Sequence, residues 1–253
     1  MSKGDFVERV IPSRVQYSLW QEHINRYFFA LRYVTNRVVC DVACGTGYGT
    51  KLISKMANLV IGVDISREAL TYAKKHYGKE YNIEFVLSDA CNLPFRDKAF
   101  DTTVSFETIE HLVCYKDFLK ETKRILKMDG KLIISTPNRQ ISSPNQEEPY
   151  NPFHVKEFDT EEFSQLLSIF FTNLQFYGQC YYTIKDWLLR FLYNHSNSFK
   201  ITVKKLNNII SRRTMPKRKM IKTINPIYRV KIFRNLYPVY APTFLIVVAT
   251  NRK

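Results

Sequence analysis

The last quarter of the sequence has no acidic residue. Residues 187–253 hold 15 lysines and arginines but no aspartate or glutamate, whereas residues 1–186 hold 23 basic and 23 acidic side chains. The formal net charge of +15 therefore belongs to one end of the chain. Such an asymmetry indicates contact with an anionic partner more strongly than the total charge does.

Three interpretations of this basic quarter stay open. It can be a solvated surface, a nucleic-acid contact, or a peripheral contact with an anionic membrane. Apolar residues beside the lysines and arginines favour the membrane. We place membrane contact slightly first and nucleic acid behind it. The apolar residues are Trp187, Leu188, Phe191 and Leu192.

Long apolar runs and an export signal are also missing. No stretch of 18 apolar residues occurs, so we expect no membrane-spanning helix. The first residues, Met1–Phe6, lack the apolar region of a secretory signal. We therefore expect a cytoplasmic protein, with any membrane association limited to the surface. The 45% apolar content of 253 residues is enough for one α/β core.

Cysteine is scarce, and its number is odd. The five cysteines are Cys40, Cys44, Cys91, Cys114 and Cys180. Their scatter predicts reduced thiols rather than a disulfide framework. Cys40 and Cys44 lie beside a glycine turn, but no second pair completes a zinc site, so we interpret them as small buried side chains.

Glycine is scarce as well, yet three of the eight glycines fall at alternate positions, Gly45, Gly47 and Gly49. They follow the apolar run Val38–Val42 and precede a helix predicted over Tyr48–Met56. Glycine has no Cβ and tolerates positive φ, so a strand, tight turn and helix of this kind bring backbone against a nucleotide-like ligand. Alone, this signal is weak.

Further strands with acidic ends follow the turn. Leu59–Asp64 ends in a carboxylate about 20 residues after the turn, where one acid can accept hydrogen bonds from two ribose hydroxyls. Ile83–Asp89 and Phe100–Glu107 are two more predicted strands that end in an acid. A nicotinamide-binding dehydrogenase would have glycine at position 43, where this chain has Ala43, and a wider glycine spacing.

Taken in order, these motifs resemble the class I S-adenosylmethionine (SAM)-dependent methyltransferases, specifically the methyltransferase-11 type. The resemblance covers Val38–Tyr177 and a final strand near Phe244–Ala249. It implies SAM as cofactor and a Rossmann-like α/β sandwich, with a mostly parallel seven-stranded sheet and an antiparallel last strand. The chain departs from the family at Ala43, which stands where the first glycine is usual and, as the smallest residue with a Cβ, should keep the turn.

The resemblance also implies roles for single residues. Gly45 and Gly47 would pass beneath the methionine part of SAM, and Asp41 would order the loop. Asp64 would hold the ribose hydroxyls, and Asp89 would accept from the adenine amino group. The implied cofactor residues are Asp41, Ala43, Gly45, Gly47, Asp64, Ile65, Asp89, Ala90 and Phe106, with Glu107 beside Phe106 at the methyl-donor pocket.

We predict four segments: a helical cover (1–36), the SAM-binding core (37–177), a basic helical insertion (178–242) and a closing strand (243–253). The loop 139–155 is long and holds three prolines, which is typical of a functional loop. In the cover, a helix over 18–34 carries four candidates to face the pocket, although we favour packing against the core. These candidates are Tyr17, Trp20, His23 and Tyr27.

The other predicted elements are helices over 115–126, 160–167 (with Asp159 and Glu162 as a capping box), 186–193 and 200–210, strands over 131–136 and 172–177, and a charged run over 212–222.

Acid–base residues follow the fourth predicted strand. Transfer of a methyl group to a hydroxyl needs a base, and Glu107, Glu110, His111 and His154 are the candidates. Because imidazole suits proton transfer near neutral pH, His111 and His154, together with Glu107, form the predicted catalytic set.

The same residues resemble a metal site. E-x-x-E-H at 107–111 with a later histidine is similar to the metal-binding pattern of small-RNA 3′-terminal 2′-O-methyltransferases, and ubiquinone-pathway O-methyltransferases share the E-x-x-E-H part. The candidate ligands are Glu107, Glu110 and His111. The chain lacks the second downstream histidine of the RNA enzymes, and an acid can simply favour a helix start. A divalent metal is thus kept as an alternative that we do not expect.

Three segments point to the acceptor: N-P-F-H-V-K-E-F at 151–158, S-T-P-N at 135–138 and F-E-T-I-E-H-L at 106–112. They resemble methyltransferases of surface-polysaccharide gene sets. The predicted function is therefore O-methylation of a sugar, a lipid-linked glycan or a related small molecule. The alternatives are an RNA 2′-O-methyltransferase and a non-catalytic SAM-fold binding module, against which the intact set of cofactor residues argues.

Overall fold

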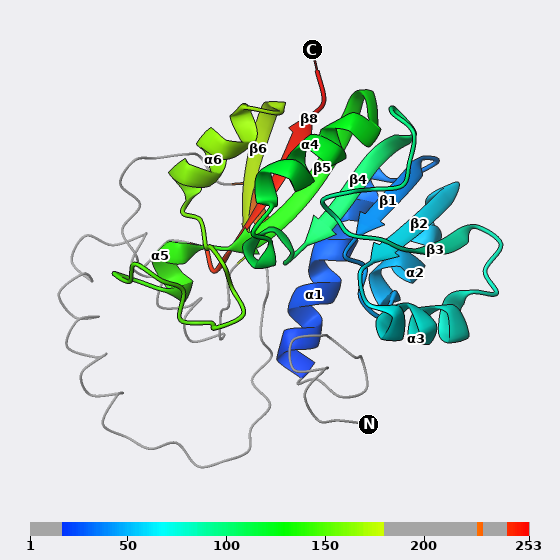
Figure 1. The fold of residues 1–253 in the computed structure, drawn as a ribbon, viewed down its shortest axis with the longest axis horizontal. Helices are drawn as coiled ribbons and strands as arrows, with labels where there is room; N and C mark the ends of the chain where they lie inside the picture. The colour runs from blue at the N-terminus through cyan, green and yellow to red at the C-terminus, as the bar shows by residue number, and fades with distance from the viewer. Residues whose placement is uncertain (1–16, 180–226, 230–241, 253) are drawn as a thin grey trace, which may run out of the picture. The chain divides into compact units, whose positions relative to one another are not determined.

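The computed structural model describes residues 17–179, 227–229 and 242–252. These residues form one eight-stranded sheet, in the order β3-β2-β1-β4-β5-β8-β6-β7, with helices packed against it (Figure 1). The strands are β1 (Val38–Val42), β2 (Leu59–Asp64), β3 (Ile83–Leu87), β4 (Phe100–Phe106), β5 (Leu126–Pro137), β6 (Thr172–Gln179), β7 (Ile227–Arg229) and β8 (Phe244–Thr250). The helices are α1 (Tyr17–Ala30), η1 (Leu31–Tyr33), α2 (Tyr48–Ser54), α3 (Arg67–Tyr77), η2 (Ile109–His111), α4 (Tyr115–Ile125), α5 (Arg139–Ser142) and α6 (Thr160–Ser168).

The direction of the strands agrees with the predicted fold class. Strands β3, β2, β1, β4 and β5 are mutually parallel, and β8 pairs antiparallel with both β5 and β6. The prediction of a mostly parallel α/β sheet with an antiparallel last strand is therefore confirmed.

The eighth strand was not predicted. Strand β7 pairs antiparallel with the end of β6, at the edge of the sheet. It lies inside the segment 178–242 that was predicted as a helical insertion, so that prediction is wrong for Ile227–Arg229. Three residues are too few to show strand periodicity in a sequence. The predicted helices over 186–193 and 200–210 and the charged run over 212–222 lie outside the described residues.

Two apolar layers enclose the sheet. Val39 of β1 packs in the layer of α1 and α2, whereas Cys40 and Val42 pack in the layer of α4 and α6. This alternation follows from the two-residue period of a strand and explains why β1 is apolar on both faces. The core thus holds the strand ends, and the turns that follow them, in place on both sides.

Two boundaries show where local signals succeed and fail. The predicted capping box is confirmed, since Asp159 accepts from the backbone of Glu162 and the Glu162 side chain accepts from the backbone of Asp159. The sequence M-D-G at Met128–Gly130 is typical of a turn, yet it forms an irregular part of β5, where Asp129 has a φ of +59° and the register with β4 shifts.

Candidate functional site

A cavity of about 870 Å³ opens at the carboxyl ends of the parallel strands. Its wall comes from the ends of β1, β2 and β4, from α1, and from the loop between α5 and α6. The cavity lies where the strand order reverses, because β2 follows β1 on one side and β4 lies on the other. Open α/β sheets bind ligands at this switch point, which makes the cavity the candidate site.

The glycine turn after β1 forms the floor of the cavity. Gly45 and Gly47 have φ values of +56° and +78°, and Ala43 also lies in the left-handed region at +59°. The turn is therefore kept despite the alanine. A Cβ built on Gly45 would meet no atom within 4 Å, so space for a ligand lies directly above this backbone. The resemblance would place the methionine part of SAM over this floor.

Gly49 serves a different purpose. A Cβ at Gly49 would lie 1.9 Å from the Tyr27 ring, so glycine lets α1 pack closely on α2. The Tyr27 hydroxyl donates to Asp41 Oδ1 at 3.2 Å, and Thr50 Oγ1 donates to Asp41 Oδ2 at 2.6 Å. Asp41 is fully buried and does not line the cavity. Burial raises the pKa of Asp41 to about 7, although these two hydrogen bonds act to lower it. Through the same two bonds, Asp41 joins the end of β1 to α1 and α2.

Asp64 lies at the end of β2 and lines the cavity. Its Oδ2 accepts from the N–H of Gly45 and its Oδ1 accepts from the N–H of Ser66, each at 2.8 Å. A carboxylate has about four lone-pair sites, so both oxygens can still accept a ribose hydroxyl. Asp64 therefore connects the glycine turn to the predicted ribose position.

The predicted adenine side comes from the loops after β2 and β3. Ile65 is exposed and lines the cavity together with Asp89 and Ala90. Asp89 Oδ1 accepts from the N–H of Cys91 at 2.9 Å, which fixes the carboxylate within its own loop. Phe106 also lines the cavity and packs edge-on against Tyr27, with ring centroids 5.0 Å apart.

The opposite wall begins at Glu107, whose backbone has a φ of +51°. Its N–H donates to Ser135 Oγ at 3.2 Å, and that hydroxyl donates to Glu107 Oε1 at 2.6 Å. The same Oε1 lies 3.9 Å from Nε of Arg26, which is fully buried. An unfavourable backbone conformation held by surrounding contacts is typical of functional positions.

Two histidines face each other on this wall, with ring centroids 4.8 Å apart. His111 Nδ1 lies 3.0 Å from the carbonyl oxygen of Phe153, and His154 Nδ1 lies 2.6 Å from Glu157 Oε1. Both partners can only accept, so each Nδ1 carries the proton and each Nε2 is the basic nitrogen. Nε2 of His154 accepts from the Asn151 side chain at 3.0 Å.

Glu110 completes a cluster with the two histidines. It is fully buried; Oε2 accepts from Thr136 Oγ1 at 3.2 Å, and Oε1 has no hydrogen-bond partner among the described residues. Burial, with Glu107 adding to it, raises the pKa of Glu110 well above its usual value. One ligand atom from each of Glu110, His111 and His154 lies within 4.8 Å of the others. This set differs from the predicted ligands, because His154 takes the place of Glu107.

Helix α1 contributes more to the cavity than expected. Trp20 packs on Tyr48, as favoured, but His23 and Tyr27 line the cavity, so the core interpretation is wrong for His23 and incomplete for Tyr27. Burial and the charge of Arg26 lower the pKa of His23 well below its usual value. The side chain of Tyr17 lies outside the described part. Leu19, His23 and Tyr27 are spaced by four residues on one helix face, and all three line the cavity. Sequence reasoning missed Glu22 and Arg26, which are buried.

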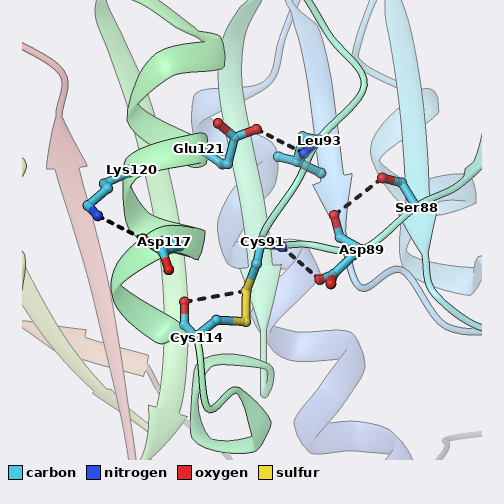
Figure 2. Close-up of a disulfide and its surroundings, with 8 residues drawn as sticks. All are labelled: Ser88, Asp89, Cys91, Leu93, Cys114, Asp117, Lys120 and Glu121. Carbon is cyan, nitrogen blue, oxygen red and sulfur yellow. Dashed lines mark hydrogen bonds and ion pairs between the residues drawn. A yellow bond between two sulfur atoms is a disulfide. The ribbon is translucent and has the colours of Figure 1, made fainter.

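The prediction of reduced thiols is wrong for two cysteines. Cys91 and Cys114 form a disulfide, with Cα atoms 6.4 Å apart (Figure 2). Their separation of 23 residues did not reveal that the loop after β3 meets the start of α4. Cys40 and Cys44 are buried thiols, as predicted, and Cys180 lies outside the described residues. None of the helices in the described ranges is long and apolar enough to cross a membrane.

Comparison with known proteins agrees with this geometry. Residues 40–134 match the methyltransferase domain family. A "Probable S-adenosylmethionine-dependent methyltransferase" of Mycobacterium tuberculosis is 35% identical over 161 residues, which are 63% of this chain and 58% of that protein. A "Ubiquinone biosynthesis O-methyltransferase" of Bradyrhizobium diazoefficiens is 33% identical over 106 residues, 42% of either protein.

The fold itself is shared with solved structures. A Thermotoga maritima protein described as "SAM-dependent methyltransferase, possible histamine N-methyltransferase" superposes with a TM-score of 0.59 at 20% identity, over 93% of this chain and 94% of that one. The chain spans less than two thirds of the length of the mycobacterial relative. Residues 40–134 are therefore similar to a methyltransferase domain, and the described residues have a fold that is shared with a SAM-dependent methyltransferase.

Proposed function

We propose that the whole chain is a SAM-dependent methyltransferase that acts on a hydroxyl oxygen of a sugar, a lipid-linked glycan or a related small molecule. One observation carries this proposal: two sets of residues line the same cavity. One set is the cofactor wall, formed by the glycine turn, Asp64 and Asp89. The other is the acceptor wall, which holds Glu107 and the cluster of Glu110, His111 and His154. Bound SAM supplies an activated methyl group on sulfur. The chain supplies orientation and a base, and the volume suits a cofactor with a small acceptor beside it.

The residues of the acceptor wall have the chemistry that a hydroxyl acceptor needs. As the methyl carbon leaves sulfur and bonds to oxygen, the hydroxyl proton must pass to a base. His154 is one candidate, because Glu157 holds its Nδ1–H and so makes Nε2 the basic nitrogen; the Asn151 amide, which donates to Nε2 at 3.0 Å, must turn away before a proton can bind there. The ring of His111, the second candidate, packs edge-on against that of His154, and Glu107, held by Ser135, is the third candidate.

A divalent cation is compatible with the same wall. Buried Oε1 of Glu110 has no partner among the described residues, and the Nδ1 atoms of His111 and His154 already have acceptors, an arrangement usual for metal-binding histidines. Glu110, His111 and His154 would hold the cation, which would lower the pKa of an acceptor hydroxyl. The Bradyrhizobium relative is named as an O-methyltransferase, which supports an oxygen acceptor in either case.

The wall disfavours the two alternatives. Among its described residues, the acids Asp64, Asp89, Glu107 and Glu110 line the cavity, and no lysine or arginine does. An RNA backbone would be repelled by these acids unless a cation covered them. A binding module without catalysis would have no use for two oriented imidazoles beside the predicted methyl position.

Transfer of a radiolabelled methyl group tests the proposal. Purified full-length protein is incubated with labelled SAM and, in separate reactions, with cell-envelope glycans, total RNA or small phenols and catechols. Label should enter a glycan or small-molecule fraction and resist mild base where the product is an ether. Each reaction is repeated with EDTA and with EDTA followed by excess Mg²⁺, which separates a base from a metal. Label in RNA alone would replace the proposed acceptor, and SAM binding without transfer to any fraction would favour the binding module.

A further inference from the structure

The Cys91–Cys114 disulfide joins two parts of the cavity wall. Cys91 comes two residues after Asp89, and Cys114 comes three residues after His111, and both of these neighbours line the cavity. Figure 2 shows the bond between the loop after β3 and the start of α4. One covalent bond therefore ties the predicted adenine loop to the segment that carries His111.

The loop after β3 is held in different ways along its length. Its later part is fixed on α4, where Glu121 accepts from the N–H of Leu93 at 2.9 Å and Arg124 donates to the carbonyl of Leu93 at 2.9 Å. Its earlier part bonds to the end of β2 through the Ser88 N–H, which donates to the carbonyl of Asp64 at 3.1 Å, and otherwise within itself, as Asp89 accepts from the N–H of Cys91 and Ser88 Oγ donates to the carbonyl of Asn92 at 2.9 Å. The disulfide fastens this earlier, cofactor-facing part to α4.

The two bonded cysteines also differ from the other described cysteines in exposure. Cys91 and Cys114 are partly exposed, whereas Cys40 and Cys44 are buried. A small thiol reagent can therefore reach the Cys91–Cys114 disulfide, whereas the buried thiols of Cys40 and Cys44 are out of its reach. We propose that Cys91 and Cys114 form a reversible redox site that sets how tightly the protein holds SAM; the proposal rests on the use of SAM proposed above.

The redox step is an ordinary thiol–disulfide exchange. The thiolate of a small dithiol attacks one sulfur of the pair, the S–S bond breaks, and a mixed disulfide forms. The second thiol of the reagent then displaces the other cysteine. Two electrons and two protons pass to the protein, which gains two thiols, while the reagent becomes a cyclic disulfide. A small disulfide drives the reverse reaction.

Reduction should weaken cofactor binding. With the bond intact, residues 88–91 are ordered before SAM arrives, whereas in the dithiol form part of that ordering must accompany binding. The Cys91 sulfur lies only 3.3 Å from the carbonyl oxygen of Cys114, so the reduced loop keeps a local contact and need not unfold. We expect an affinity loss of about five- to tenfold, at the low end of usual coupling between sites.

Calorimetry with S-adenosylhomocysteine, the stable product of SAM, tests this. Full-length protein is titrated after treatment with oxidised or reduced dithiothreitol, with mass spectrometry to count the bonded cysteines. EDTA is included because Asp89 and the two reduced thiols lie close enough to hold a cation. Hydrogen exchange in residues 88–95 should increase on reduction. The double variant Cys91→Ser/Cys114→Ser should bind like the reduced protein and ignore both reagents, while Cys40→Ala should respond like the unchanged protein.

The outcomes separate the two proposals. Equal affinities for the oxidised and reduced proteins, with mass spectrometry showing complete reduction, would overturn the redox site and leave the methyltransferase intact. Failure of the pair to oxidise at all would do the same. If S-adenosylhomocysteine binds in neither state, the proposed function fails and the redox inference with it. The comparison of the two states of the unchanged protein needs no variant to fold.

Discussion

The two walls of the cavity are built on different principles. The cofactor wall comes mainly from consecutive strand ends, with the glycine turn and Asp64 joined by a backbone hydrogen bond. The acceptor wall gathers side chains from α1, η2, the loop before α6 and Phe244 at the start of β8. The cofactor wall depends on the backbone conformation of turns at strand ends, whereas the acceptor wall depends on contacts between segments that are far apart in the sequence. Because the fold alone sets the first, cofactor use should vary less than acceptor use among proteins with this sheet.

The largest effect should come from the histidines of the acceptor wall. His154→Ala or His111→Ala should lower kcat by about 10²–10⁴-fold where that residue takes the acceptor proton, with SAM affinity unchanged. The measurement is methyl transfer at saturating SAM beside calorimetry. His76→Ala, on the exposed face of α3, is the matched control and should leave both quantities unchanged.

Retained turnover in both variants would mean either that Glu107 takes the proton or that the acceptor loses none, as with an amine or an ionised oxygen. A fall in SAM affinity equal to the fall in kcat would instead show that the two walls are not separate.

A smaller effect is expected on the cofactor wall. Asp64→Ala should weaken SAM binding by about 1–3 kcal/mol, because two ribose hydroxyls lose a charged acceptor. Asp64→Asn removes the charge and one of the two acceptor oxygens, and should weaken binding less. Asp117→Ala, an exposed acid on α4, serves as the control in the same calorimetry. Unchanged affinity in Asp64→Ala would remove this residue from the site.

The smallest effect concerns the buried charges behind the acceptor wall. Burial raises the pKa of Glu22 to about 7, the charge of Arg26 opposes the shift, and Glu107 adds to it. The folded protein thus binds this proton more tightly than the unfolded chain, where the pKa is near 4.5. The folded protein therefore loses stability as the pH rises from the unfolded pKa of Glu22 to its folded pKa, and the loss is complete above pH 7. Glu22→Gln should remove that loss.

The measurement is thermal unfolding at pH 5 and pH 8. The stability of Glu22→Gln relative to the unchanged protein should rise between the two pH values by about 1–2 kcal/mol. Glu84→Gln, exposed on β3, should show no such trend. A difference for Glu22→Gln that does not depend on pH would mean that the pKa of Glu22 is the same in the folded protein and the unfolded chain.

What the sequence could predict follows the same division. The fold class, Asp64 and the glycine turn were accessible because strand ends and turns have local signatures. Arg26 and the disulfide were not, because each depends on which distant segments meet: Arg26 Nη1 donates to Gln179 of β6, and Cys91 bonds to Cys114. The interpretations of the basic quarter remain predictions, since most of it lies outside the described residues.

Gly45, Gly47 and Gly49 are each glycine for a different structural reason. Gly45 leaves room for a ligand, Gly47 has a left-handed backbone against Ala73 and Phe85, and Gly49 admits the ring of Tyr27. A descendant that lost its cofactor would be released from the first constraint and still held by the other two. The φ of +56° at Gly45 would still favour residues that tolerate a left-handed backbone, such as asparagine, so substitutions at position 45 should be of that kind. Position 49 should stay glycine for as long as α1 covers α2.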